Sequence, residues 1–159
     1  MDAGRRKALK TGGGVTLATL LAAAGWLEPG SAHAQAGGWN KAAFDAKTLD
    51  EAVKAMGGGA ATPSNAITFV STPDIAENGA VVPIGVSSSI PNTRSIAILI
   101  EKNPSLLAAS FDIPPGTEAV VSTRVKMGQS SMVYALVNAD GKVHVASKEV
   151  KVTLGGCGG

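Results

Sequence analysis

The fold is decided by residues 118–152, which read EAVVSTRVKMGQSSMVYALVNADGKVHVASKEVKV. This stretch holds three runs, 118–127, 130–139 and 142–152, that are rich in β-branched residues and roughly alternate between apolar and polar side chains. Asp140-Gly141 separates the last two runs, and Asp-Gly is typical of a two-residue hairpin turn. The stretch therefore predicts three consecutive strands, the last two of which form a hairpin.

Four further runs of the same kind lie upstream, at residues 66–71, 80–88, 95–101 and 106–113. The turn signals around them are Glu77-Asn78-Gly79, Asn103-Pro104 and Pro114-Pro115-Gly116. About seven short strands at this spacing predict a mainly β protein, an antiparallel β-sandwich of immunoglobulin-like type. We expect the sandwich to occupy about residues 64–153.

Two irregularities interrupt the strand pattern. Pro83 lacks a backbone N–H, so its presence in the second run predicts an edge strand or a bulge there. In the last run the apolar set changes register, from Val143 and Val145 to Val150 and Val152. One inserted residue would explain that change, and it predicts a β-bulge near residues 147–149.

A helix is predicted before the strands, at about residues 40–57. The larger apolar residues recur at roughly helical spacing, namely Trp39, Phe44, Leu49, Val53 and Met56. Thr48 and Glu51 have the spacing of a capping box, and Gly57 supplies a stop. We expect this helix to lie on its own domain, and a helix that binds a partner is the alternative.

The first 34 residues have the organisation of an export signal. A basic start containing Arg5 and Arg6 precedes VTLATLLAAAGWL, and Ala32 and Ala34 form a small-x-small cleavage pattern. The apolar stretch is shorter than the about 20 residues that span a bilayer. GRRKALK resembles a twin-arginine motif, so we predict a twin-arginine signal peptide at 1–34 and a periplasmic mature chain. A short buried helix is the alternative.

Charge and composition limit the possible functions of the remaining chain. Four of the 14 Lys and Arg and two of the 12 Asp and Glu lie in residues 1–34, so the mature chain has ten of each sign. A balanced chain lacks the basic footprint of a nucleic-acid-binding protein. The overall 45% hydrophobic and 16% charged residues are typical of one ordinary globular domain.

The mature sequence contains no recognisable catalytic or metal-binding set. His144 is its only imidazole and Cys157 its only thiol, which is too few for a zinc or copper site within one subunit. No serine lies in a Gly-x-Ser-x-Gly context, and no phosphate-binding glycine motif opens a helix. We therefore expect no catalytic residues, no metal and no cofactor, with His144 as a half-exposed strand residue.

The notable chemistry lies in residues 154–159, which end in Gly155-Gly156-Cys157-Gly158-Gly159. A disulfide within the chain is excluded because there is no second cysteine, and the position of Cys157 does not suit lipidation. An intermolecular disulfide or an incidental free thiol stays open. The sharper alternative is a covalent carrier arm. Glycines have no Cβ, so such an arm can pass through a narrow enzyme channel.

The reactivity of that thiol constrains a carrier role. An ordinary cysteine has a pKa of about 8.5, so only a small fraction is thiolate at neutral pH. Four glycines supply no cation that would lower the pKa. We expect the enzyme that receives the arm to activate the sulfur.

Three features together resemble the SoxY family, the sulfur carriers of bacterial thiosulfate oxidation: the GGCGG end, the twin-arginine signal and the strand-rich body. Residues 101–116, EKNPSLLAASFDIPPG, and 121–137, VSTRVKMGQSSMVYALV, resemble consecutive family strands and turns. The resemblance covers most of the mature chain and assigns residues 35–153 to a SoxY-like domain. Departures at Gly4 and Ala8 affect only the export motif.

The resemblance implies a role and a set of partners. SoxZ would be the second subunit of a heterodimer, and intermediates would be held covalently on Cys157. SoxAX, a haem c enzyme, would join thiosulfate to that sulfur. SoxB, a manganese hydrolase, would release sulfate, and SoxCD, where present, would oxidise the remaining sulfane sulfur. The carrier itself would not be an enzyme.

Two rival classes stay open. Ubiquitin-like sulfur carriers also end in Gly-Gly, but they carry sulfur as a thiocarboxylate, here on Gly159. The export signal and the position of Cys157 argue against them. The other rival is a periplasmic binding module with an incidental thiol.

Overall fold

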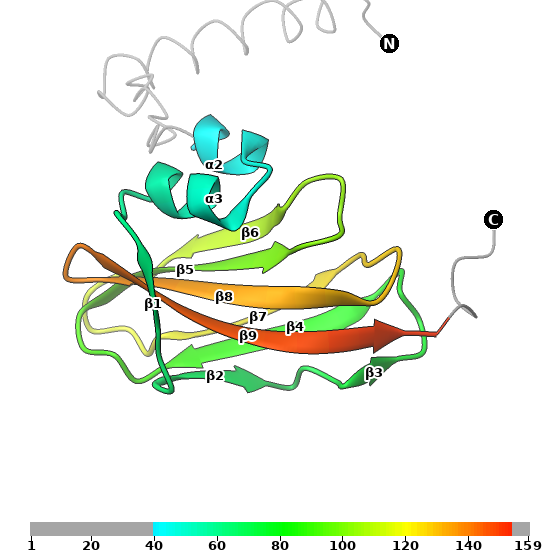
Figure 1. Ribbon diagram of the computed structural model, residues 1–159. Coiled ribbons are helices and arrows are strands. Elements are labelled where there is room, and N and C mark those ends of the chain that lie inside the picture. The colour runs from blue at the N-terminus through cyan, green and yellow to red at the C-terminus, as the bar shows by residue number, and fades with distance from the viewer. Residues whose placement is uncertain (1–39, 154–159) are drawn as a thin grey trace, which may run out of the picture. The chain divides into compact units, whose positions relative to one another are not determined.

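The computed structural model describes residues 40–153, all of which belong to the second of the two units of the chain, Asn40–Gly159. Within these residues there are two helices and nine strands (Figure 1). The helices are α2 (Lys41–Asp45) and α3 (Leu49–Ala55). The strands are β1 (Ala61–Pro63), β2 (Ile67–Val70), β3 (Ile75–Ala76), β4 (Val82–Ser88), β5 (Thr93–Ile100), β6 (Leu107–Asp112), β7 (Val120–Val125), β8 (Ser131–Ala139) and β9 (Lys142–Val152).

The strands form two sheets that pack face to face. The larger sheet has the order β1-β9-β8-β5-β6, with β3 also paired to β9, and the smaller sheet has the order β2-β4-β7. The predicted immunoglobulin-like β-sandwich is confirmed, and each of the seven predicted strands is present. The two additional strands, β1 and β3, are short and pair with β9 in parallel. Neither has enough residues to show an alternating pattern.

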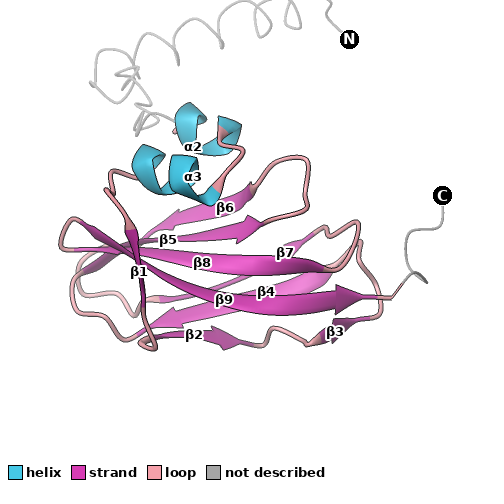
Figure 2. Ribbon diagram, viewed as in Figure 1, coloured by secondary structure: helices cyan, strands magenta, loops and turns pink. Residues whose placement is uncertain are grey.

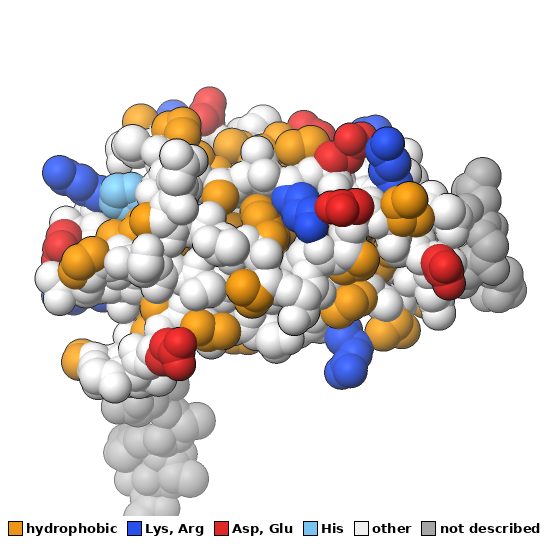
Figure 3. All heavy atoms as spheres, turned by 90° about the horizontal axis from the view of Figure 1, so that it is seen from below, with side chains coloured by type: hydrophobic (Ala, Val, Ile, Leu, Met, Phe, Trp, Pro, Cys, Tyr) orange, Lys and Arg blue, Asp and Glu red, His pale blue; other side chains and the backbone are white. Residues whose placement is uncertain are grey.

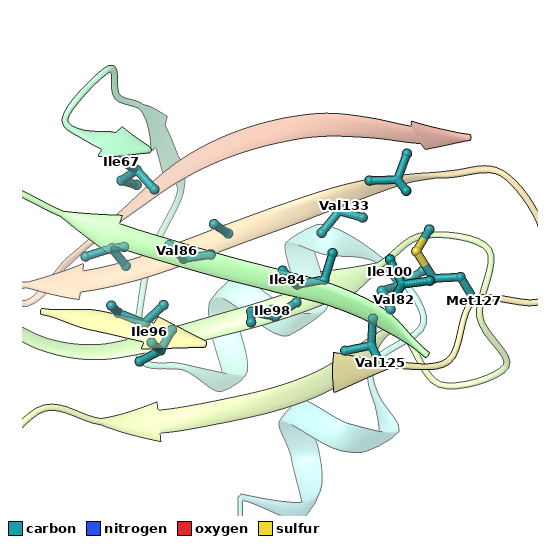
Figure 4. Packing of buried hydrophobic residues seen from close by; sticks show 14 of the residues in the cluster. Ile67, Val82, Ile84, Val86, Ile96, Ile98, Ile100, Val125, Met127 and Val133 are labelled. Atoms are coloured by element: carbon teal, nitrogen blue, oxygen red, sulfur yellow. The ribbon is translucent and has the colours of Figure 1, made fainter. Parts of the chain in front are cut away.

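The larger sheet is buried on both of its faces along β5, which explains the apolar run at the end of that strand. Ile96, Ile98 and Ile100 face the smaller sheet and join the main core (Figure 4). Ala97 and Leu99 belong to a second cluster, under the helices. Each fully buried Ile or Leu side chain contributes about 1.5–3 kcal/mol through removal from water.

The same two-sided burial corrects the prediction of a β-bulge near residues 147–149. The pairing of β8 with β9 runs without a shift from Ser131 opposite Val150 to Ala139 opposite Lys142. Val143 and Val145 belong to the cluster under the helices, whereas Val150 and Val152 belong to the sandwich core. The apolar positions change register because the first part of β9 has its apolar side chains on the face under the helices, and the last part has them on the face toward the smaller sheet.

The prediction that Pro83 marks an edge strand or a bulge is also wrong. β4 is the central strand of the smaller sheet, and its pairing with β7 is continuous from Val82 to Ser87. The pairing of β2 with β4 extends only as far as Gly85, so β4 has one neighbour at Pro83. Gly85 N–H points toward the β2 side, and residues two apart point the same way. The missing donor of Pro83 therefore faces the side where β2 has already ended.

The single predicted helix at 40–57 is divided into α2 and α3, which lie together on one side of the larger sheet (Figure 2). The predicted capping box is present, and it causes the division. Thr48 has an extended backbone, with φ −125° and ψ 156°, so it begins α3 rather than continuing α2. Gly57, with φ +83°, follows the end of α3 as predicted.

The helices cover their own sheet, as expected. Ala43, Ala46, Ala52 and Val53 are buried in the cluster that they share with β5, β6, β8 and β9.

Hydrogen bonds from the backbone N–H groups of Lys47 and Thr48 lower the pKa of Glu51, the Lys47 bond having the larger effect. Neither helix in residues 40–153 has the length and apolar character needed to cross a membrane.

Candidate functional site

The predicted site residues lie outside the described part of the chain. These are Cys157 with Gly155, Gly156, Gly158 and Gly159, and the export-signal residues Arg5, Arg6, Ala32 and Ala34. The structure does describe the residues that come directly before the carrier segment, residues 154–159. The last of them is Thr153, four residues before Cys157.

The end of β9 extends beyond its antiparallel neighbour. The last residue pair between β8 and β9 is Ser131 with Val150, so Lys151, Val152 and Thr153 have no partner on β8. These three residues, which we call the tail root, are held instead by β3. Ile75 pairs with Lys151 and Ala76 pairs with Val152, in a parallel arrangement.

Backbone hydrogen bonds fix each residue of the tail root. Lys151 N–H donates to the Asp74 carbonyl at 2.9 Å, and Thr153 N–H donates to the Ala76 carbonyl at 3.1 Å. Val152 N–H donates to Ser130 Oγ at 2.9 Å. The Thr153 hydroxyl adds a long bond of 3.5 Å to the Glu77 carbonyl. We call Asp74–Glu77 together with Ser130 the clamp.

Close packing at Gly79 holds the clamp against the sandwich. Met127 N–H donates to the Gly79 carbonyl at 2.7 Å. A Cβ at Gly79 would lie 2.4 Å from the Met127 carbonyl oxygen and 2.8 Å from Val152 Cγ1. Only glycine allows this approach, so the loop after β3, the end of β7 and the tail root form one packed unit.

Lys148 connects the middle of β9 to the segment that leads into the clamp. Its Nζ donates to the Thr72 carbonyl at 2.5 Å and lies 3.0 Å from Asp74 Oδ1. The Asp74 side chain is 88% exposed, so the ion pair contributes well under about 1 kcal/mol. The contact therefore matters more for the position of the segment than for stability.

Other polar groups in residues 40–153 offer less chemistry. His144 is half-buried on β9, as expected, and pairs with Thr62 and Val137. Burial, and then the nearby Glu101 carboxylate, raise the pKa of Tyr134. In this part of the chain no three His, Cys, Asp or Glu side chains come together in a way that could hold a metal ion.

A polar depression lies at the end of the sandwich away from the tail root. Its lining comes mainly from the loops between β4 and β5 and between β6 and β7, and it also includes Arg94 of β5, Asp112 of β6 and Asp140 of the turn between β8 and β9. All three of these side chains are exposed. An open depression of mixed charge gives no indication of a ligand.

Comparison with known proteins identifies the family. A family model described as sulfur oxidation protein SoxY matches residues 53–157, a range that ends at Cys157. The chain belongs to the SoxY family. This confirms the resemblance, and it makes the chain a member of a sulfur-oxidation family.

A solved SoxY structure agrees with this membership. The sulfur carrier protein SoxY from Chlorobium limicola f thiosulfatophilum is 41% identical, with a TM-score of 0.59. The match covers 67% of this chain and 96% of that chain. The similarity therefore extends over nearly the whole Chlorobium protein.

Weaker likenesses carry no functional inference. A superoxide reductase (neelaredoxin) from Ignicoccus hospitalis is 22% identical over 55% of this chain and 79% of that chain, with a TM-score of 0.49. No curated protein matches the chain.

Sequence reasoning missed the clamp. The strand signal is absent because β3 has only two residues and pairs with a segment more than 70 positions away. The one available signal was the turn Glu77-Asn78-Gly79, which indicates a tight reversal but not its neighbour.

Proposed function

We propose that this SoxY-family protein is a covalent carrier of sulfur intermediates in periplasmic thiosulfate oxidation, with Cys157 as the attachment site. The observation that carries the proposal is the extent of the family match, which runs through the whole sandwich and includes Cys157. The 41% identical Chlorobium protein is a sulfur carrier protein, which supports the same role. Cys157 is also the only cysteine of the chain.

The carrier cycle begins with formation of an S–S bond. The Cys157 sulfur joins the outer sulfur of thiosulfate, the S–H bond breaks, and one proton is released. An electron pair passes to a haem c oxidant in the loading enzyme. Hydrolysis of the S–SO₃ bond by one water then releases sulfate and a proton, and a persulfide remains on Cys157.

The persulfide can be carried further where a sulfane dehydrogenase is present. Oxidation of its outer sulfur to a sulfonate takes oxygen from three waters and releases seven protons and six electrons to the acceptor of the dehydrogenase. A second hydrolysis releases sulfate and a proton and restores the thiol. The carrier holds the sulfur intermediate covalently throughout the cycle, and the partner enzymes catalyse every step.

The proposed partners follow from Sox-system membership. SoxZ is the proposed heterodimer subunit, and SoxAX, SoxB and, where present, SoxCD are the proposed transient partners. The sandwich has open strand edges, since β6 ends the larger sheet and β2 and β7 end the smaller one. An open edge exposes unpaired backbone N–H and C=O groups that another chain can bind, which supports a stable partner subunit.

Intact-protein mass spectrometry tests the carrier role directly. Protein purified from cells grown on thiosulfate is expected to show adducts of one thiosulfate group and of one sulfur atom, both located on Cys157. Treatment with a reductant should remove both adducts, because each contains an S–S bond. A thiocarboxylate on Gly159 would instead support the ubiquitin-like alternative, and unmodified protein would support the incidental thiol.

The export route has its own test. Replacement of both Arg5 and Arg6 with Lys is expected to leave the precursor in the cytoplasm, because the twin-arginine exporter recognises the guanidinium pair and not charge alone. Immunoblots of periplasmic and cytoplasmic fractions provide the measurement. Lys7→Arg is the matched control and should be exported normally. Unchanged periplasmic yield of the double variant would contradict the proposed route.

A further inference from the structure

We propose that the surface around the tail root, marked by the exposed side chains of Ile75 and Val81, is the docking rim for the enzyme that loads thiosulfate onto Cys157. This inference rests on the proposed carrier function and adds to it the place at which the loading enzyme makes contact. It is argued from the clamp, from the length of chain beyond it, and from the character of the surface beside it.

The clamp gives the carrier segment a fixed origin. Each of Lys151, Val152 and Thr153 donates a backbone hydrogen bond to a described neighbour. The Val152 side chain packs against the main core, and Gly79 allows the surrounding loop to close on it. The chain is therefore held to the sandwich as far as Thr153.

The chain beyond this origin is short. Cys157 lies four residues after Thr153. At about 3.3 Å per residue, a fully extended chain places the sulfur at most about 13 Å from Thr153. Without the clamp this upper limit would be counted from a residue three positions earlier, and it would increase by about 10 Å. An enzyme whose site receives Cys157 must therefore come into contact with the sandwich next to the tail root.

The surface next to the tail root is suited to such contact. Three large hydrophobic side chains are exposed among residues 40–153, namely Ile75 at 56%, Val81 at 50% and Val120 at 43%. Ile75 lies opposite Lys151 of the tail root in the sheet register. Val81 comes two residues after Gly79, whose added Cβ would contact Val152. Two of the three thus border the origin of the carrier segment.

Charge gives this surface little selectivity. Seen from below, side chains of both charge signs are mixed with hydrophobic ones over the face that carries β2, β3 and β9 (Figure 3). A mixed surface has no strong field of one sign that would steer a partner. Apolar contact through Ile75 and Val81 is then the main attraction that the rim offers.

Val120 provides a matched control because it lies at the other end of the sandwich. Val120 pairs with Ser87 near the end of β4, whereas Val82, next to Val81, pairs with Val125 at the opposite end of β7. Val120 also has a similar exposed fraction. A charged substitution there changes the surface in the same way at a place that the carrier segment does not reach.

The test compares Ile75→Asp and Val81→Asp with Val120→Asp. Purified thiosulfate-loading enzyme, thiosulfate and ferricyanide as electron acceptor are mixed with each carrier in complex with its partner subunit, and the Cys157 adduct is followed by intact mass. The initial loading rate at limiting carrier concentration is expected to fall about tenfold for Ile75→Asp and Val81→Asp. Val120→Asp should load at the wild-type rate, and iodoacetamide should alkylate Cys157 equally in every variant.

A longer carrier segment supplies the second arm of the test. Insertion of a ten-residue Gly-Ser spacer after Thr153 lets the enzyme receive Cys157 without touching the rim. With the spacer, the difference in loading between wild type and Ile75→Asp is expected to shrink to about twofold or less. A tenfold difference that persists with the spacer would overturn the reach argument.

Other results would overturn the proposal in distinct ways. Equal loading of all three Asp variants would show that the rim is not used. Release of the partner subunit from Ile75→Asp in analytical ultracentrifugation would show that the surface belongs to the subunit interface. Both results leave the carrier function intact, because it is tested separately: loading that continues in Cys157→Ser would contradict that function and not only the docking rim.

Discussion

Cys157→Ser is expected to abolish thiosulfate-dependent turnover completely while the protein remains folded. A serine hydroxyl cannot form the S–S bond on which every later step depends, so no slow residual pathway is available. Oxygen consumption or reduction of the electron acceptor, measured with purified partners and thiosulfate, reports turnover. Intact mass should show no adduct of any kind.

The fold of the variant is expected to be unchanged because the substitution replaces a single sulfur atom with oxygen. The two hydrophobic clusters within residues 40–153, which hold the two sheets and the helices together, keep all of their side chains. Thermal unfolding should therefore agree with wild type within about 1 °C. Cys157→Ala serves as the companion variant and should behave identically. Full turnover in either variant would rule out the carrier hypothesis.

Local sequence pattern was sufficient for the strands that carry the core. β4, β5, β8 and β9 are long and rich in Val, Ile and Leu, so each shows its character within its own residues. The capping box of α3 is also local, since it needs only Thr48 and Glu51. The GGCGG end is a contiguous motif as well, which is why the family could be recognised from it.

The errors arose where tertiary context decides the structure. The change of apolar register in β9 looked like a bulge because the sequence does not tell that helices cover the second face of the sheet. Pro83 led to the prediction that the whole strand lies at an edge, whereas β4 is central and lacks a neighbour on one side only at its start, because β2 pairs no further than Gly85. The clamp depends on contacts between residues 74–77 and 151–153, which no short window contains.

The largest effect on stability is expected at Gly85, a buried residue of β4. Gly85 pairs with Val70, the last residue of β2. A Cβ at position 85 would lie 2.2 Å from the Val70 carbonyl oxygen and 3.0 Å from Val70 Cγ2. Because the nearest atom is backbone, no side-chain rotation relieves the clash, and the end of β2 must move away from β4.

That movement would also disturb a buried polar contact. The Thr72 hydroxyl, in a residue only 8% exposed, accepts a hydrogen bond from Gly85 N–H at 3.1 Å. The same hydroxyl lies 3.3 Å from the carbonyl oxygens of both Gly85 and Val70, and it can donate a hydrogen bond to either of them. A shift of Val70 separates these groups and leaves part of the buried hydrogen-bonding capacity unused, which costs about 1–3 kcal/mol.

The disturbance continues along the chain toward the tail root. The Thr72 carbonyl accepts a hydrogen bond from Lys148 Nζ, and Asp74, two residues later, begins the clamp. A displaced Thr72 therefore weakens the clamp from its N-terminal side. Hydrogen exchange at the Lys151 and Thr153 amides should be faster in Gly85→Ala than in wild type under native conditions, because both amides donate to the clamp.

Gly85→Ala is accordingly expected to lower the free energy of unfolding by about 3 kcal/mol, the sum of overpacking and a damaged buried hydrogen bond. For a domain of this size the corresponding loss in Tm is about 10 °C. Gly59→Ala is the matched control, because a Cβ there meets nothing within 4 Å, and its effect should stay below about 1 kcal/mol. Urea unfolding of both variants measures the difference. Equal stability of the two variants would show that β2 does not pack against Gly85 as closely as the register requires. It would also contradict the expected effect of Gly85→Ala on the clamp, because that effect depends on displacement of Val70 and Thr72.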